Sequence, residues 1–373
     1  MHGIVKNMQK IKNILINFLI FIISFLMMYG IVEGVLQISN VSPVPIIPSG
    51  LYINHDSIGH QFSSNFKGSI KSEDGIWATI QTDELGIWEG PKYSYNNPPI
   101  LILGDSFTHG SYCCNLQDTY PKIVQTYLKQ KNISLTVINA GVPGHETKNE
   151  VEFLKIYYNH INSSLVILTF YVGNDILGNL NPNKYEVIDG KLTNPTKHEN
   201  VPFRNIRESL AKNSAVYRVF TKFLVSTIFK EESYVASKVK YFSISAREVY
   251  SKEILETEKS FLDFKKFCNE KNITCVVHII PDKLQILKDT PVLLKRYNIS
   301  SIEQDILWPQ EHFSKFFKEQ NILYYDLTDV FSNVEESEEL FLPINGHWSK
   351  KGSRLAGEFL GEIIYINYYN GKK

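Results

Sequence analysis

The chain has 373 residues, of which 43% are hydrophobic and 21% are charged, the composition of an ordinary globular protein. Lys and Arg total 39, as do Asp and Glu, so no excess of positive charge points to nucleic acid as a partner. Four cysteines are too few for a disulfide scaffold in a chain of this length. No His or Cys residues have the spacing of zinc ligands, and we expect neither a metal nor a cofactor.

The first segment of note is the apolar run 14–32. At the helical rise of about 1.5 Å per residue, it spans roughly the ~30 Å hydrocarbon core of a bilayer. Three lysines precede the run and Glu33 follows it, which predicts a cytoplasmic N-terminus and an extracytoplasmic remainder. We expect residues 1–36 to form a cytoplasmic tail and an uncleaved transmembrane helix. A cleaved signal peptide is the alternative, although no Ala-x-Ala site follows the run.

Residues 37–98 are predicted to form a linker and a β-rich N-terminal arm. Pro43, Pro45 and Pro48 favour an extended tether at its start. Beyond residue 50 the sequence interleaves Gly, Asn, Asp and Trp, which is typical of short strands and turns.

Residues 99–370 alternate β-branched apolar runs with amphipathic segments. Strands are predicted at 99–103, 135–139, 165–171, 274–280 and 322–326. Helices are predicted at 120–131, 146–160, 249–271, 302–319 and 349–366, the last with Ser349 as its N-cap. This alternation predicts an α/β fold, a three-layer α/β/α sandwich around a parallel five-stranded sheet.

One stretch, residues 176–248, interrupts the alternation. Within it, residues 184–192 are predicted to form a hairpin, because Asp189-Gly190 favours a type I′ turn. The stretch leaves the sheet immediately after Asn174, where it could wall a site. It is either a substrate-shaping insertion or a surface embellishment.

Four motifs occur in a fixed order along the chain: Gly104-Asp105-Ser106, Asn139 to Gly144, Gly173-Asn174-Asp175 and Asn345-Gly346-His347-Trp348. Together they resemble the SGNH (GDSL-type) hydrolase superfamily, which is named for its serine, glycine, asparagine and histidine. The resemblance implies a sheet in the flavodoxin-like order 2-1-3-4-5. It is closest in type to membrane-anchored relatives that are associated with surface polysaccharide modification.

The resemblance also implies roles for the matching residues. Ser106 is the expected nucleophile and His347 the expected base, because attack on a carbonyl requires removal of the hydroxyl proton. The oxyanion hole is expected from the Ser106 and Gly144 backbone N–H groups and the Asn174 side-chain amide. A Pro-Gly turn at Gly144 and a helix cap at Asn174 are the structural alternatives.

Asn345 departs from the family pattern, because relatives carry an aspartate at this position or one residue earlier. An asparagine can accept a hydrogen bond from the imidazole but offers it no negative charge, and it could favour the wrong tautomer. Three outcomes are open: Asn345 orients His347 in a working pair, an acid such as Asp326 or Asp329 is recruited, or catalysis is lost. The first is the hypothesis we prefer.

The motifs favour an extracytoplasmic serine esterase that removes O-acyl groups, with acetyl the expected one, from a glycan or a related ester. An O-acyltransferase that passes the acyl group to a polysaccharide could use the same residues. A catalytically weak glycan-binding or assembly module is the third hypothesis. The expected partners are an acylated carbohydrate, the membrane and membrane-bound polysaccharide machinery, and not nucleic acid.

Overall fold

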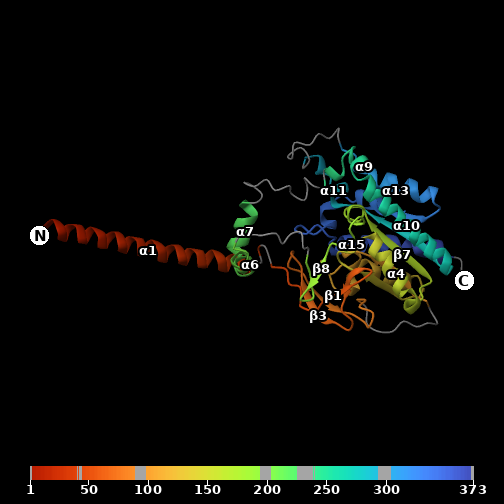
Figure 1. The fold of residues 1–373 in the computed structure, drawn as a ribbon, viewed down its shortest axis with the longest axis horizontal. Helices are drawn as coiled ribbons and strands as arrows, with labels where there is room; N and C mark the ends of the chain where they lie inside the picture. The colour runs from red at the N-terminus through yellow and green to blue at the C-terminus, as the bar shows by residue number, and fades with distance from the viewer. Residues whose placement is uncertain are drawn as a thin grey trace. The chain divides into compact units, whose positions relative to one another are not determined.

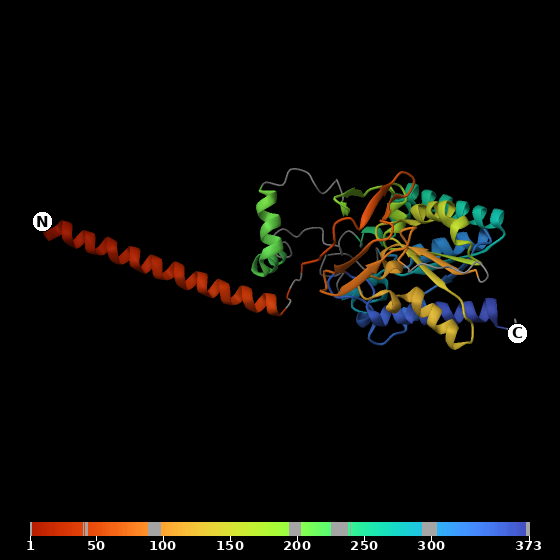
Figure 2. The ribbon, with the colours of Figure 1, turned by 90° about the horizontal axis from the view of Figure 1, so that it is seen from below.

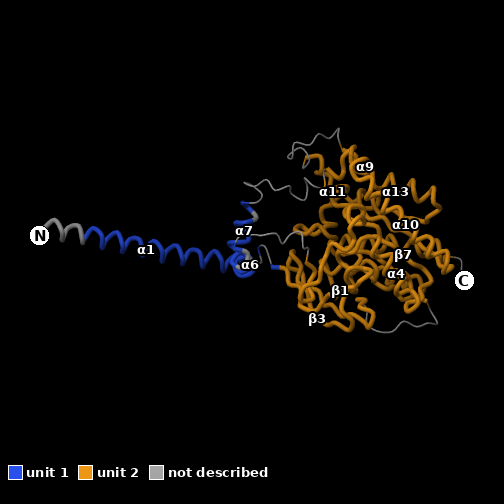
Figure 3. Tube along the Cα trace, in the orientation of Figure 1, with its two compact units in different colours: residues 1–44, 201–231 blue, residues 45–200, 232–373 orange. Residues whose placement is uncertain are grey.

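A computed structural model of the chain describes residues 2–39, 41, 44–88, 98–193, 203–224, 238, 240–292 and 304–370 (Figure 1). The chain forms two compact units (Figure 3). Unit 1 comprises residues 1–44 and 201–231, and unit 2 comprises residues 45–200 and 232–373. The predicted insertion 176–248 is therefore divided between the two units.

Unit 2 is built on a five-stranded parallel sheet. Its strands are β5 (Ile100–Gly104), β6 (Val137–Gly141), β7 (Leu165–Tyr171), β10 (Thr274–Ile280) and β11 (Leu323–Asp326). They lie in the order β11-β10-β7-β5-β6, with every neighbouring pair parallel. Counted along the chain, this is the order 2-1-3-4-5, so the predicted fold class and topology are confirmed. The strands begin and end within two residues of their predicted bounds.

Helices cover both faces of the sheet, as Figure 2 shows. One face carries α4 (Thr147–Ile161), α10 (Ser251–Lys271) and α13 (Trp308–Glu319). The other carries α3 (Tyr120–Gln130) and α15 (Lys350–Ile364), with the short α14 (Thr328–Ser332) beside them. Alternate strand residues point to opposite faces, so Leu101 and Leu103 join one apolar core and Ile100 and Ile102 the other.

Most predicted helix bounds agree with the structure. The predicted N-cap Ser349 accepts from the backbone N–H groups of Lys351 and Gly352 at 3.2 and 3.3 Å. The helix expected at 302–319 is observed from Trp308, and residues 302 and 303 lie outside the described residues. Short helices follow three of the strands, α2 (Ser106–His109) after β5, α5 (Asp175–Gly178) after β7 and α11 (Lys283–Ile286) after β10, and the short α9 (Ala246–Val249) precedes α10.

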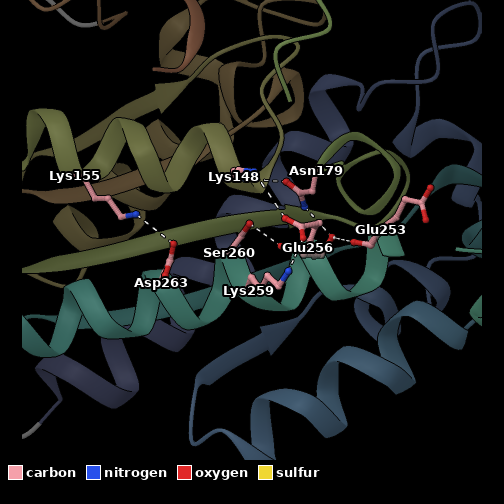
Figure 4. Close-up of polar contacts among 9 residues, drawn as sticks. Lys148, Lys155, Asn179, Glu253, Glu256, Lys259, Ser260 and Asp263 are labelled. Atoms are coloured by element: carbon pink, nitrogen blue, oxygen red, sulfur yellow. Dashed lines mark hydrogen bonds and ion pairs between the residues drawn. The ribbon is translucent and has the colours of Figure 1, made fainter. Parts of the chain in front are cut away.

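Polar contacts join α4 to α10 along their exposed edges. Figure 4 shows Lys148 and Lys155 of α4 reaching Glu256 and Asp263 of α10, at 3.9 and 3.5 Å. Such exposed ion pairs contribute little each, about 0–1 kcal/mol. Asn179 is better placed, because its side chain accepts from the Lys148 N–H and donates to Thr257, both at 2.9 Å. Asn179 therefore ties the end of α5 to both helices.

The N-terminal arm of unit 2 contains two β-hairpins. They pair β1 (Tyr52–His55) with β2 (Gly59–Phe62) and β3 (Lys67–Lys71) with β4 (Trp77–Gln81), each antiparallel. The predicted type I′ hairpin is also present, as β8 (Glu186–Ile188) and β9 (Lys191–Thr193), with φ of 52° at Asp189 and 72° at Gly190.

Unit 1 contains α1 (His2–Ile38), α6 (Arg204–Asn213) and α7 (Ala215–Leu224). By length and composition, α1 could cross a membrane over Gln9–Ile38, and it is the one described helix that meets this criterion. Elsewhere, Cys268 at the end of α10 is joined by a disulfide to Cys275 of β10. Cys113 and Cys114 are paired with each other and buried.

Candidate active site

The nucleophile candidate lies where β5 turns into α2. Asp105 is the N-cap of α2 and accepts from the Phe107 backbone N–H at 2.8 Å, which fixes the turn that presents Ser106. The turn packs tightly on its surroundings, because a Cβ on Gly104 would lie 1.9 Å from Thr108 Oγ1. Glycine is therefore required at the end of β5, directly before Asp105 and Ser106.

The base candidate lies on the loop before α15. This loop is closed by the Leu342 N–H, which donates to the His347 carbonyl at 2.7 Å, and it leads directly into the N-cap Ser349. The imidazole lies between two aromatic rings, with ring centroids 4.8 Å from Phe107 and 4.3 Å from Tyr112. Its position is therefore set by packing on both faces.

The structure brings the two candidates together. His347 Nε2 lies 2.8 Å from Ser106 Oγ, although 241 residues separate them in the sequence. This is hydrogen-bonding distance, and it is the geometry that a nucleophile and its general base need. Parallel strands bring their carboxyl ends to one rim of the sheet, which explains how residues so far apart in sequence meet.

Asn345 contacts the other edge of the imidazole. Its Oδ1 accepts from the His347 backbone N–H at 3.0 Å and lies 3.3 Å from His347 Nδ1. A backbone N–H can only donate, so the atom that faces it must be the amide oxygen. The same oxygen faces Nδ1, which favours the tautomer that carries a proton on Nδ1 and leaves Nε2 free to accept from Ser106.

The sequence did not reveal the acid that lies nearest to this loop, Asp74. Its two carboxylate oxygens accept from the backbone N–H groups of Ile344 and Asn345 at 2.8 and 3.2 Å. Asp74 lies in the β3–β4 turn, and no local sequence signal connects it with a loop 270 residues later. The acids suggested from sequence are placed elsewhere: Asp326 caps α14 through Thr328, and Asp329 lies within that helix.

Asn174, the first candidate for the oxyanion hole, lines the same cavity as Ser106. Its Nδ2 donates to Asp105 Oδ2 at 3.3 Å, which leaves the second hydrogen of the amide available. Asp175, the next residue, accepts from the Tyr171 backbone N–H at 3.1 Å and from Thr147 at 3.0 Å. Two buried carboxylates therefore hold the turn that carries Asn174.

Gly144, the second candidate, adopts φ of +84° in the loop after β6, a conformation that favours glycine. Its neighbours are Tyr185 and His60, whose atoms would lie 3.0 and 3.4 Å from a Cβ at this position. Gly144 is not among the described residues that line the cavity beside Ser106. The structure thus brings Ser106, Asn174, Asn345 and His347 to one cavity and packs Gly144 beside Tyr185 and His60.

The cavity has a volume of about 410 Å³ and is lined by three groups of residues. The first group is the rim itself, and the second is the start of the insertion, Leu177, Gly178, Asn181 and Lys184. Lys238 of unit 2 and Tyr171 complete the wall. Each lysine has a carboxylate partner, Glu146 for Lys184 and Asp282 for Lys238. The insertion therefore lines the cavity with residues from its start and with Lys238 near its end.

Burial shifts the pKa of several groups here. The pKa of His347 is lowered to about 4, because its enclosed ring is poorly solvated and the opposing effect of the contact with Asn345 is smaller. Burial raises the pKa of Asp105 to about 6, against the hydrogen bonds from Phe107 and Asn174. At neutral pH the imidazole is therefore uncharged and able to accept a proton. Among the described residues, no group of three or more His, Cys, Asp or Glu is placed to hold a metal ion.

A parallel sheet covered on both faces, with a serine–histidine pair at the carboxyl ends of its strands, has the arrangement that acyl-transfer chemistry at a serine requires. The sequence model of one family, described as "SGNH hydrolase-like domain, acetyltransferase AlgX", matches residues 243–369. This is about a third of the chain, and it includes His347 but not Ser106. With the sheet order and the four motifs, this match supports the SGNH (GDSL-type) hydrolase superfamily and acyl-ester chemistry.

Comparison with solved structures gives weak similarities of the same kind. An acetyl xylan esterase, AlAXEase, is 14% identical over 72% of this chain and 99% of its own, with a TM-score of 0.38. TesA is 10% identical over 72% and 98%, with a TM-score of 0.40. The esterase EstA from Pseudoalteromonas sp. is 12% identical over 73% and 100%, with a TM-score of 0.36. A sequence search of curated proteins returned no match.

Proposed function

We propose that the chain is a membrane-anchored serine esterase that removes O-acyl groups, acetyl foremost, from a glycan outside the membrane. The observation that carries the proposal is the 2.8 Å contact between Ser106 Oγ and His347 Nε2 in the wall of an open cavity. The apolar run 14–32 within α1, preceded by lysines and followed by Glu33, supports an anchor with a cytoplasmic N-terminus.

In the proposed reaction, Ser106 Oγ attacks the ester carbonyl carbon as its proton passes to His347 Nε2. The negative charge that forms on the carbonyl oxygen is stabilised by the second N–H of Asn174 and by the backbone N–H of Ser106. The C–O bond to the alcohol then breaks, and His347 returns its proton to the departing oxygen. A water molecule then attacks the carbonyl carbon of the acyl-serine while His347 takes its proton. The bond to Ser106 Oγ breaks, the carboxylic acid is released, and His347 returns the proton to restore the serine hydroxyl.

Ser106→Ala provides the direct test. We expect the full chain to hydrolyse p-nitrophenyl acetate, and we expect Ser106→Ala to reduce the rate by at least about 10³-fold, because the nucleophile is gone. A fluorophosphonate probe should label the wild-type chain and not the variant. Hydrolysis that survives the substitution would reject the nucleophile, whereas a folded but unlabelled wild-type chain that binds glycan would favour the binding-module hypothesis.

Acyl transfer is the second candidate, and the description of the matching family, which names an acetyltransferase, favours it. The same acyl-serine would then be attacked by a sugar hydroxyl in place of water. Adding an oligosaccharide acceptor to the esterase assay separates the two functions. Product partitioning toward the acylated sugar indicates a transferase, and partitioning that stays with acetate indicates a hydrolase.

A further inference from the structure

Unit 1 carries an apolar surface on the α6–α7 hairpin, residues 203–224. Five large apolar side chains among its described residues are exposed: Phe203 (78%), Ile206 (59%), Leu210 (41%), Phe220 (56%) and Phe223 (59%). The first three are spaced by three and four residues, so they share one face of α6. On α7, Phe220 has the same relation to Val216, four residues earlier. Each helix is thus amphipathic, with its apolar stripe solvent-facing in the described structure.

The sequence of this hairpin carries mostly positive charges. The sequence of the hairpin contains one acidic residue, Glu208, and five basic ones, Arg204, Arg207, Lys212, Arg218 and Lys222. Basic residues beside exposed Phe and Leu are typical of helices that lie in the plane of a membrane interface, where anionic headgroups meet the acyl chains. A protein-core helix would bury the same apolar residues.

The hairpin is tied to the end of α1. The Glu33 carboxylate accepts from the backbone N–H groups of Ala215 and Val216 at 2.6 and 3.0 Å, so it caps the N-terminus of α7. It also accepts from the Ser214 hydroxyl at 2.8 Å, and that hydroxyl lies 2.8 Å from Tyr29 Oη. The corner between α6 and α7 is therefore held at residues 29–33 of α1.

The level of this corner in a bilayer follows from the length of the apolar run. Residues 14–32 rise roughly 28 Å as a helix, close to the ~30 Å of the hydrocarbon core. Glu33 therefore lies at the boundary where the hydrocarbon ends, with the tyrosine at position 29 in the zone that interfacial aromatics prefer. Because Glu33 holds the corner, α6 ends and α7 begins at this boundary.

We propose that the α6–α7 hairpin is a lipid-binding element that lies on the bilayer surface from which α1 emerges, with Phe203, Ile206, Leu210 and Phe220 facing the acyl chains. The inference rests on the proposed membrane anchor but not on the proposed chemistry. An interfacial hairpin joined to the anchor would fix the level and direction in which the chain leaves the membrane.

Depth-dependent fluorescence quenching tests this on the full chain. Single cysteines at Leu210 and Phe220 would carry an environment-sensitive label, with Lys212 on the opposite face of α6 as the matched control. A label at Phe18, in the middle of α1, reports on the anchor itself. The chain is reconstituted into phosphatidylcholine–phosphatidylglycerol vesicles that contain lipids with a spin-label quencher near the headgroup or deep in the acyl chain.

We expect headgroup-proximal quenching at Leu210 and Phe220 to exceed that at Lys212 by about twofold, because an interfacial helix buries its apolar face ~5–10 Å deep. Glu33→Ala should reduce this difference without changing the signal from Phe18. Equal quenching at all three hairpin positions overturns the proposal, and that is also the outcome if a protein partner covers the surface. An unquenched Phe18 rejects the anchor, and p-nitrophenyl acetate hydrolysis on the same samples reports separately on the chemistry.

Discussion

The two halves of the Ser106–His347 pair are supported in different ways. The nucleophile side is built from within the α/β unit: buried carboxylates, Asp105 and Asp175, hold the turns that carry Ser106 and Asn174. The base, His347, is oriented by Asn345 of its own loop. That loop is held in turn by Asp74, which belongs to the N-terminal arm outside the α/β unit. The comparison teaches that the nucleophile is fixed by the fold, whereas the base depends on an appended hairpin.

The largest effect that would sharpen this comparison is expected at Asn174, on the nucleophile side. Removal of one oxyanion donor typically costs about 10²–10³ in kcat, so we expect Asn174→Ala to lower kcat by this factor with little change in KM. Asn181→Ala is the matched control, because Asn181 lines the same cavity without touching the rim turn. Equal losses in both variants would show that Asn174 only shapes the cavity.

On the base side, Asp74→Ala should lower kcat by about 10- to 100-fold. It removes both acceptors of the loop N–H groups, and small displacements of a catalytic group are costly. Steady-state hydrolysis of p-nitrophenyl acetate measures the loss. Glu73→Gln is the control, since it removes an exposed charge from the same turn. If the two substitutions act alike, Asp74 contributes only general electrostatics and the arm does not position the base.

Asn345→Asp should raise kcat, by about tenfold, because a carboxylate in place of the amide would stabilise the imidazolium that forms during attack. The same charge raises the pKa of His347 from its present value of about 4 toward its ordinary range. The base must be neutral, so activity of the wild-type chain should fall only as pH drops through about 4, and the acidic limb of the variant should lie higher. If the acidic limb of the pH–activity profile is the same in the variant and the wild type, the side chain at position 345 does not affect the pKa of His347.

This contrast also explains how far the sequence alone could be used. The sheet order was implied by the family resemblance, and the position of Ser106 and its pairing with His347 follow from the motifs and from the shared rim of a parallel sheet. Asp74 could not be predicted, because its contact with the loop depends on how the β3–β4 turn packs on the unit. Nor does the Pro-Gly motif at Gly144 indicate that Tyr185, from the insertion, packs beside that glycine.

The insertion illustrates the same limit. Its hairpin was predictable from Asp189-Gly190, because a type I′ turn has a strong local signature. Its division between the two units could not be predicted. Residues 203–224 belong to unit 1, where the Glu33 carboxylate caps α7. That carboxylate lies about 180 residues earlier, and nothing in the local sequence of α7 indicates it.

The smallest expected effect concerns stability and the buried carboxylates behind the nucleophile. Glu150 is 1% exposed, and neither of its carboxylate oxygens has a hydrogen-bond partner among the described residues. Burial, followed by the nearby Asp175 and Asp105, raises the pKa of Glu150 well above its usual 4.5. The native state therefore keeps this proton at pH values where the unfolded chain has lost it. Each pH unit in that window costs the native state about 1.4 kcal/mol.

Glu150→Gln removes this titration while keeping the shape of the side chain. In the wild type, the free energy of unfolding falls as pH rises from about 4.5 up to the native pKa of Glu150. The variant lacks this loss, so its stability relative to the wild type should increase between pH 5 and pH 7. We expect a relative gain of about 1–3 kcal/mol in the free energy of unfolding, measured by urea denaturation at the two pH values. Glu152→Gln, a more exposed change on the same helix, should show no such dependence. If the difference in stability between Glu150→Gln and the wild type does not change with pH, the Glu150 carboxyl is ionised in the native state. The contrast between the buried support of Ser106 and the support that Asp74 gives to the His347 loop would then be weaker.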